Sequence, residues 1–214
     1  MVLKGREKQI VDERIKKIGT LREAGVNPYA HRFDLNDERV HSVDVKEKFA
    51  KLKDEAKSGK SAVVAGRVMT KRSFGKLSFF NLQDLRGTIQ IVVQKGEVPE
   101  AVVDMFKKTD AGDIVGVKGE VVKTRTGEVS IMAQEIFILT KSILPLPDKH
   151  AGLKDEEEKL RKRYLDIIMN EEVKDIFVKK QRFWNATRSF LIDRNFLEVE
   201  TPVLETSAGG AAAT

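Results

Sequence analysis

The chain has 214 residues, of which 41% are hydrophobic and 34% charged, with a formal net charge of +6 and no cysteine. This composition predicts a folded, soluble protein and excludes disulfides, thiolate metal sites and cysteine nucleophiles. No apolar run approaches the roughly 20 residues that a membrane-spanning helix needs, and residues 1–10 lack the apolar stretch of a secretory signal. We therefore expect a cytoplasmic protein without membrane contact.

The positive charge is concentrated in the first two thirds of the chain. Residues 1–60 carry 15 Lys and Arg against 11 Asp and Glu, and residues 61–140 carry 11 against 9. Such an excess favours a polyanionic partner, because cations that neutralise phosphates supply the sequence-independent part of nucleic-acid affinity. An ordinary soluble surface explains the charge equally well. The three histidines are dispersed without ligand spacing, so no metal site is predicted.

Residues 1–60 read as a helical extension. Apolar residues recur at three- and four-residue steps over 6–24, which predicts an amphipathic helix that Gly25 and Pro28 end. A second short helix is expected from about residue 43 to residue 57. The segment 58–60, Ser-Gly-Lys, breaks that helix.

Residues 61–141 form the second predicted domain. Short runs of β-forming residues separated by turn residues predict strands at the following positions: 61–70, 77–84, 88–94, 113–123 and 128–139. One helix, with Pro99 in its first turn and Gly112 beyond its end, lies between the third and fourth strands. Three strands, a helix and two strands is the order of an oligonucleotide-binding (OB) barrel. We expect a mainly β domain within an α+β chain; a small barrel that binds no nucleic acid stays an open alternative.

The last third of the chain is predicted to be helical. Residues 142–153 read as a linker, and residues 154–214 as a separate domain that begins with a helix capped by Asp155. A longer helix is expected over 171–194, where Asn195 adopts the left-handed turn that closes it. The alternating residues 196–202 then predict a short strand that Pro202 stops.

Strand parity predicts which side chains point out of the barrel. If Phe80 and Leu82 face inward, then Phe79 faces outward, because successive side chains of a strand alternate. The same argument places Gln90 outward on the next strand. An outward aromatic beside an outward amide, with Lys71, Arg72 and Lys76 on the adjoining hairpin, is what single-stranded nucleic acid needs. Packing of Phe79 against one of the predicted helices is the open alternative.

Four stretches resemble class II lysyl-tRNA synthetases. Residues 64–84 and 123–130 are similar to the opening strands and the last hairpin of that family's anticodon-binding domain. Residues 144–166 resemble its interdomain segment. Residues 196–202 with Gly209-Gly210-Ala211 are similar to class II motif 1 and its continuation. Thr214 departs from the family, which usually places a basic residue there. Aspartyl- and asparaginyl-tRNA synthetases share the barrel and motif 1, and they remain alternatives.

The resemblance implies roles for individual residues. Phe79 would stack on an anticodon base, while Arg72, Gln90 and Glu128 would contact anticodon bases or their backbone. The role of Glu128 rests on the resemblance alone, since the pattern indicates only a solvated turn residue. Pro202 would lie in a homodimer interface that motif 1 builds. The glycines, Gly209 and Gly210, would lie near the lysine pocket, although a flexible loop would have the same sequence.

The family's reaction joins lysine to its tRNA through lysyl-adenylate, using ATP and Mg²⁺. The two motifs that bind ATP, a Phe-Arg-any-Glu sequence and a glycine-rich stretch ending in arginine, do not occur in this sequence. We therefore expect a fragment that carries the anticodon-binding barrel and motif 1, that is inactive alone and that binds ATP and Mg²⁺ poorly. A stand-alone tRNA-binding module is the competing hypothesis from a different class.

Overall fold

A computed structural model describes residues 5–147, 153 and 155–203. The chain divides into two compact units, Met1–Leu146 and Pro147–Thr214, and each is described by itself. Among the described residues, no helix has both the length and the apolar character needed to cross a membrane.

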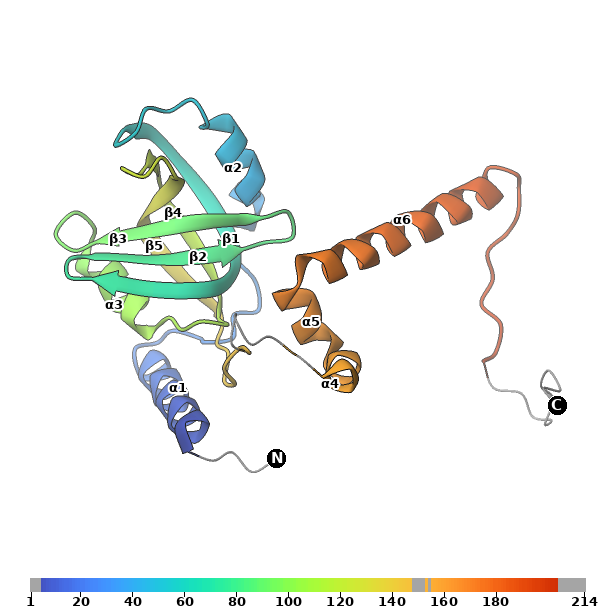
Figure 1. Cartoon of the computed structure of the whole chain (residues 1–214), viewed down its shortest axis with the longest axis horizontal. Helices are drawn as coiled ribbons and strands as arrows, with labels where there is room; N and C mark the ends of the chain where they lie inside the picture. The colour runs from blue at the N-terminus through green and yellow to red at the C-terminus, as the bar shows by residue number, and fades with distance from the viewer. Residues whose placement is uncertain (1–4, 148–152, 154, 204–214) are drawn as a thin grey trace. The chain divides into compact units, whose positions relative to one another are not determined.

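Five strands of the first unit close into a barrel (Figure 1). Their bounds are β1 Lys57–Phe74, β2 Leu77–Gln83, β3 Thr88–Gln94, β4 Ile114–Lys123 and β5 Val129–Thr140. Neighbours around the barrel follow the order β1-β2-β3-β5-β4, and every pairing is antiparallel except the short parallel one between β3 and β5. The chain matches the OB order predicted from the sequence, and all five predicted strands are present.

The barrel interior is filled by one set of side chains from each strand. On β2 the buried residues are Phe80 and Leu82, and on β3 they include Ile89, Ile91 and Val93. These are the residues that strand parity assigned to the inside, so the predicted parity is confirmed. Their partners on β4 and β5 are also buried aliphatic residues, among them Val115, Val117, Val121, Ile131 and Ile138.

Helix α3 (Glu100–Lys108) and helix α1 (Gly5–Glu23) pack at one end of this barrel. Phe106 of α3 stacks against Phe80, with ring centroids 5.8 Å apart. Arg14 of α1 is buried and donates to the carbonyl oxygens of Ala111, Ser142 and Leu144 at 2.8–3.0 Å. A predicted amphipathic helix is therefore tied to the barrel by one buried cation as well as by its apolar face.

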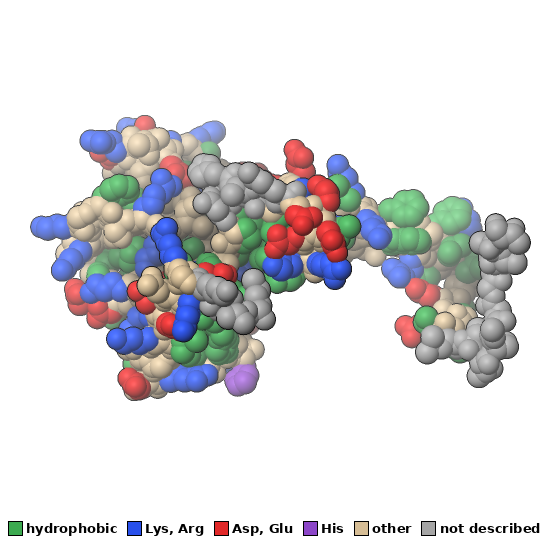
Figure 2. All heavy atoms as spheres, turned by 60° about the horizontal axis from the view of Figure 1, so that its bottom comes forward, with side chains coloured by type: hydrophobic (Ala, Val, Ile, Leu, Met, Phe, Trp, Pro, Cys, Tyr) green, Lys and Arg blue, Asp and Glu red, His purple; other side chains and the backbone are tan. Residues whose placement is uncertain are grey.

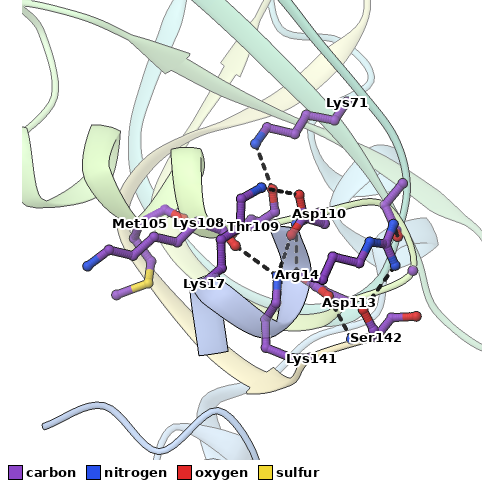
Figure 3. Close-up of polar contacts among 12 residues, drawn as sticks. Arg14, Lys17, Lys71, Met105, Lys108, Thr109, Asp110, Asp113, Lys141 and Ser142 are labelled. Atoms are coloured by element: carbon purple, nitrogen blue, oxygen red, sulfur yellow. Dashed lines mark hydrogen bonds and ion pairs between the residues drawn. The ribbon is translucent and has the colours of Figure 1, made fainter. Parts of the chain in front are cut away.

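A dense polar cluster joins α1, α3 and the end of β5, and Figure 3 shows its contacts. Lys141 is almost completely buried, and its ammonium group lies 2.6 Å from Asp113, 2.7 Å from Asp110 and 2.8 Å from the Lys108 carbonyl oxygen. Lys17 of α1 forms an ion pair with Asp110. Each charge of this cluster has a partner of opposite charge or several backbone partners, which is the condition for burying it.

The second predicted helix is much shorter than expected. Helix α2 spans Ser42–Lys48, following a single 3₁₀ turn at Asn36–Glu38, and residues 49–56 form turns. Lys123 of β4 holds those turns, since its ammonium group donates to the Leu52 carbonyl oxygen at 3.0 Å and lies 3.2 Å from Asp54. These contacts with the barrel override the helical preference of the segment, and β1 begins at Lys57.

The second unit consists of α4 (Glu156–Arg161), α5 (Arg163–Met169) and α6 (Glu171–Ile192). Asp155 caps α4 by accepting from the backbone N–H of Glu157, as the predicted cap requires. The sequence predicted a single helix after Asp155, but the structure divides this helix at Lys162 into α4 and α5. Asn195 follows α6 with a φ of +64°, which confirms the predicted left-handed turn.

Helix α6 presents large hydrophobic side chains to solvent, and green side chains are visible along it in Figure 2. They include Phe183, Trp184 and Phe190, each more than half exposed. The strand predicted for residues 196–202 is wrong, because that stretch forms no ladder. A strand needs a neighbour to accept its backbone hydrogen bonds, and none of the described segments pairs with this one.

Candidate nucleic-acid interface

A groove of about 510 Å³ lies on the outer face of the barrel. Its floor comes from β2 and β3, and one wall comes from the end of β4 with the hairpin that leads to β5. Residues 55 and 56, which precede β1, and Lys57 at its start add a further wall. Phe79, Gln90 and Val92 lie on the floor, and Lys57, Lys123 and Arg125 lie on the walls. The groove thus combines one aromatic ring, two amides (Gln90 and Gln94), three cations and two carboxylates (Glu55 and Glu97).

Phe79 points into this groove. It stands opposite Arg72 of β1 and Val92 of β3, and its neighbour Phe80 is 1% exposed in the core. The Phe79 side chain is partly exposed. The phenylalanine that packs on α3 is Phe80, not Phe79. The ring proposed from strand parity as a stacking platform is therefore open to the groove.

Gln90 is held at both ends of its side-chain amide. Its Nε2 donates to Oε2 of Glu128 at 3.2 Å, and its Oε1 accepts from the hydroxyl of Ser130 at 3.0 Å. Asn81 of β2 lies directly across from it. The structure thus joins Gln90, which parity favoured, to Glu128, which rested on the family resemblance alone.

Glu128 is the last residue before β5, in the hairpin that follows β4. Its backbone N–H donates to the Thr124 hydroxyl at 3.1 Å, and its carbonyl oxygen accepts from the backbone N–H of Thr124 at 3.0 Å. Gly127 makes this turn possible with a φ of +80°, a conformation that costs glycine little. The Glu128 carboxylate also lies 3.9 Å from the ammonium group of Lys46 on α2.

The predicted cations divide into two groups. Arg72 is exposed on β1 across from Phe79, and Lys76 is exposed in the β1–β2 turn. Among the described residues, neither has an ion pair within 4.0 Å. Both have the free charge that contact with a phosphate needs.

Lys71 does not join them, and its prediction as a nucleic-acid contact needs correction. Its ammonium group donates to the carbonyl oxygens of Phe106 and Thr109 at 2.7 and 2.6 Å, at the end of α3, and lies 4.4 Å from the Phe106 ring centroid. Burial lowers the pKa of Lys71 to about 8, because the desolvation outweighs the attraction of Asp110. The alternation of β1 turns Lys71 and Arg72 to opposite sides of the strand.

Several residues around the groove were not predicted. Ser130 is buried on β5 and touches Gln90, and Lys46 reaches Glu128 from α2. Lys57, Lys123 and Arg125 line the walls. A buried serine within a run of aliphatic residues is a signal that sequence reading can use, since a buried hydroxyl needs a partner. The contact of Lys46 depends on where α2 lies, which no local pattern gives.

The remaining predicted positions lie in the second unit. Pro202 is exposed within the irregular segment after α6. Gly209 and Gly210 lie outside the described residues. No group of three or more potential metal ligands occurs among the residues that the structure describes.

Comparison with known proteins adds two domain assignments. Residues 62–139 match the family described as OB-fold nucleic acid binding domain, and residues 155–214 match the family described as tRNA synthetases class II (D, K and N). The first match begins within β1 and runs to the penultimate residue of β5, so it includes part or all of each of the five strands. The second begins at the residue that caps α4.

The similar curated proteins are lysine–tRNA ligases. The one from Halalkalibacterium halodurans is 47% identical over 202 residues, which cover 94% of this chain and 40% of that protein. The one from Syntrophomonas wolfei is 42% identical over 200 residues, which cover 94% of this chain and 39% of that protein. The one from Nostoc punctiforme is 42% identical over 215 residues, which cover 97% of this chain and 38% of that protein. The chain spans about two fifths of the length of these relatives.

Proposed function

The chain belongs to the class II tRNA synthetases, in the group of the lysine–tRNA ligases, and from this we propose that its barrel binds the anticodon loop of a lysine tRNA. The observation that carries the proposal is the groove lined by the partly exposed Phe79 ring and by Gln90, whose amide is hydrogen-bonded to the Glu128 carboxylate. An aromatic face stacks on an unpaired base, and the amide and carboxylate offer hydrogen bonds to base edges.

The charge around the groove supports the same partner. Lys57 and Arg125 are exposed cations that line the groove, Arg72 is exposed across from Phe79, and Lys76 is exposed in the β1–β2 turn. Lys57 shares its charge with Glu97 at 3.0 Å, whereas Arg125 has no ion pair among the described residues. Cations that border a stacking surface hold the phosphates of a single strand, so we expect affinity to fall as salt rises.

A titration of the chain with RNA stem-loops tests this proposal. One stem-loop carries the lysine anticodon and a matched one carries a non-lysine anticodon, and each is measured at low and at physiological salt. We expect the lysine loop to bind more tightly at both salt concentrations, while both affinities fall as salt rises. Equal affinity for the two loops, or a preference that disappears at the higher salt, would contradict base reading by the groove.

For the whole protein we propose the reaction of the family, in which lysine is activated with ATP and transferred to tRNA. ATP and Mg²⁺ would supply the adenylate chemistry. Among the described residues, no group of three or more potential metal ligands occurs, and none of these residues is assigned to that step. We expect the 214-residue chain to show no lysine-dependent exchange of pyrophosphate into ATP; a clear exchange signal from the purified chain would contradict this.

We also propose that the second unit takes part in a homodimer through the segment that ends at Pro202. The exposed Phe183, Trp184 and Phe190 of α6 support an apolar interface, because large aromatic side chains in a row seldom face water without a partner. Sedimentation equilibrium of the chain tests the proposal. A monomer mass that stays constant as protein concentration rises would count against it.

A further inference from the structure

We propose that Ser130 and Lys46 are positioning residues that hold the Gln90 amide in one orientation, and that this orientation decides which base edge the groove accepts. The inference rests on the RNA-binding function proposed above. It adds two residues that need not touch RNA, one buried in β5 and one on α2.

The chemistry of the neighbours fixes the orientation of the amide. An ionised carboxylate only accepts hydrogen bonds, so the end of Gln90 that faces Glu128 must be its NH₂ group. The Oε1 atom of Gln90 then faces Ser130, whose hydroxyl donates to it at 3.0 Å. Turning the amide by 180° would set the Gln90 oxygen against the Glu128 carboxylate, and it would leave the Ser130 hydroxyl to donate to the Glu128 carbonyl oxygen, 3.1 Å away, instead of to Gln90.

Ser130 is well placed to act as the inner restraint. Its residue is 0% exposed, and its Cα is paired with that of Gln90 in the parallel contact between β3 and β5. The same hydroxyl lies 3.1 Å from the carbonyl oxygen of Glu128. The hydroxyl therefore contacts the side chain of Gln90 and the backbone of Glu128, the two residues that we propose as base contacts, and it is shielded from water.

Lys46 acts as the outer restraint, on the far side of Glu128. Its ammonium group lies 3.9 Å from Glu128 Oε1, while Gln90 uses Oε2. Helix α2 is anchored to the barrel at its start, where the backbone N–H and the hydroxyl of Ser42 donate to Asp84 at 2.7 and 2.9 Å. The attraction of an ammonium group on a fixed helix restrains the carboxylate that keeps the NH₂ group of Gln90 in place.

The restrained amide leaves a defined set of groups for RNA. Gln90 retains one N–H and one lone pair of Oε1, and both belong to a side chain on the groove floor. Uridine and cytidine differ at their pairing edge by an exchange of donor and acceptor. An amide that turns freely can match either edge, whereas an amide held at both ends matches one. Restraint by Ser130 and Lys46 therefore produces selectivity rather than general affinity.

The test compares the affinities of two stem-loops that differ only by a uridine-to-cytidine change in the lysine anticodon, made at each anticodon position in turn. We expect Ser130→Ala to reduce the uridine-to-cytidine affinity ratio at one position by roughly three- to tenfold. Ser130→Thr, which keeps the hydroxyl, should restore most of that ratio. Ser73→Ala is the matched control, because Ser73 lies exposed on β1 and, within the described part of the chain, its hydroxyl bonds only to Ser78 at 3.1 Å.

The outcomes separate this inference from the function on which it rests. If the unaltered chain does not prefer the lysine stem-loop, the proposed function fails. If it does, and Ser130→Ala keeps every ratio within twofold of the unaltered chain, the inference is overturned. Should Ser130→Ala not fold, Lys46→Met decides, since Lys46 is partly exposed on α2. It should lower the same ratio about two- to threefold at low salt, and an unchanged ratio would overturn the inference.

Discussion

The barrel carries two polar clusters that use their charges in opposite ways. At the end covered by α1 and α3, the buried Lys141 is paired with the buried Asp113 and with the partly buried Asp110. On the groove face, Gln90 and Glu128 are also bonded together, but each keeps hydrogen-bonding capacity that no described protein atom uses. A cluster whose bonds are complete stabilises the fold. A cluster that is held in place but incomplete is available to a ligand.

The neighbours Lys71 and Arg72 show how little separates the two clusters in sequence. Both are cations on the same strand, and charge alone assigned both to RNA. Lys71 turns toward α3 and donates to its last carbonyl oxygens, whereas Arg72 stays exposed across from Phe79. A basic run therefore identifies an interface only after each residue has been assigned to a face of the strand.

The largest expected effect is the loss of the buried ion pair. Replacing Lys141 with methionine keeps the volume of the side chain but leaves Asp113 buried without its ammonium partner. We expect the free energy of unfolding to fall by about 3–5 kcal/mol, measured by chemical denaturation. Lys118→Met is the control, because Lys118 pairs with Glu38 at 3.8 Å near the surface, and it should cost less than about 1 kcal/mol. Equal effects would mean that the buried cluster does not stabilise the fold.

A smaller effect is expected from Lys71, through its pH dependence. Burial lowers its pKa from 10.5 to about 8 in the folded chain. Between pH 8 and pH 10.5, Lys71 is protonated to a greater extent in the unfolded chain than in the folded chain. The contribution of Lys71 to the free energy of unfolding therefore rises with pH over this range. The difference in unfolding free energy between the unaltered chain and Lys71→Met should therefore shift in favour of the unaltered chain from pH 8 to pH 10. Parallel pH profiles would contradict the burial of this ammonium group.

The smallest effect separates Lys71 from Arg72 by RNA binding. Arg72→Ala should weaken binding of the lysine stem-loop by about threefold at low salt. It should also lower the slope of log affinity against log salt concentration by the amount that about one phosphate contact contributes. Lys71→Met should leave both quantities unchanged, since the ammonium group already donates to α3. If the two variants weaken binding equally, the assignment of these residues to different faces is wrong.

The barrel was predictable because its strands are specified by patterns of neighbouring residues. Alternation within β2 and β3 identified the buried residues, and turn residues separated the five strands. The second helix was overestimated because Lys123, about 70 residues further along, holds residues 50–54 in turns. Long-range contacts of this kind leave no periodic pattern in the segment that they reshape.

The groove was predictable in part for the same reason. Parity placed Phe79 and Gln90 on one face, but nothing local indicated that Glu128 lies beside Gln90, since the contact joins strands 38 residues apart. In the second unit the alternation of residues 196–202 predicted a strand that is absent. Alternation shows that a segment can pair, whereas pairing requires a neighbouring strand, and the described residues supply none.

The measurement that tests the central claim most directly compares two phenylalanines of the same β1–β2 region. Phe79 lines the groove, whereas Phe74 is 65% exposed at the hairpin and does not line it. Phe79→Ala should weaken binding of the lysine anticodon stem-loop by about 1–3 kcal/mol, the value of one stacked base, and Phe74→Ala should leave it unchanged. Equal affinity of the Phe79→Ala variant and the unaltered chain would contradict the groove as the RNA-binding surface.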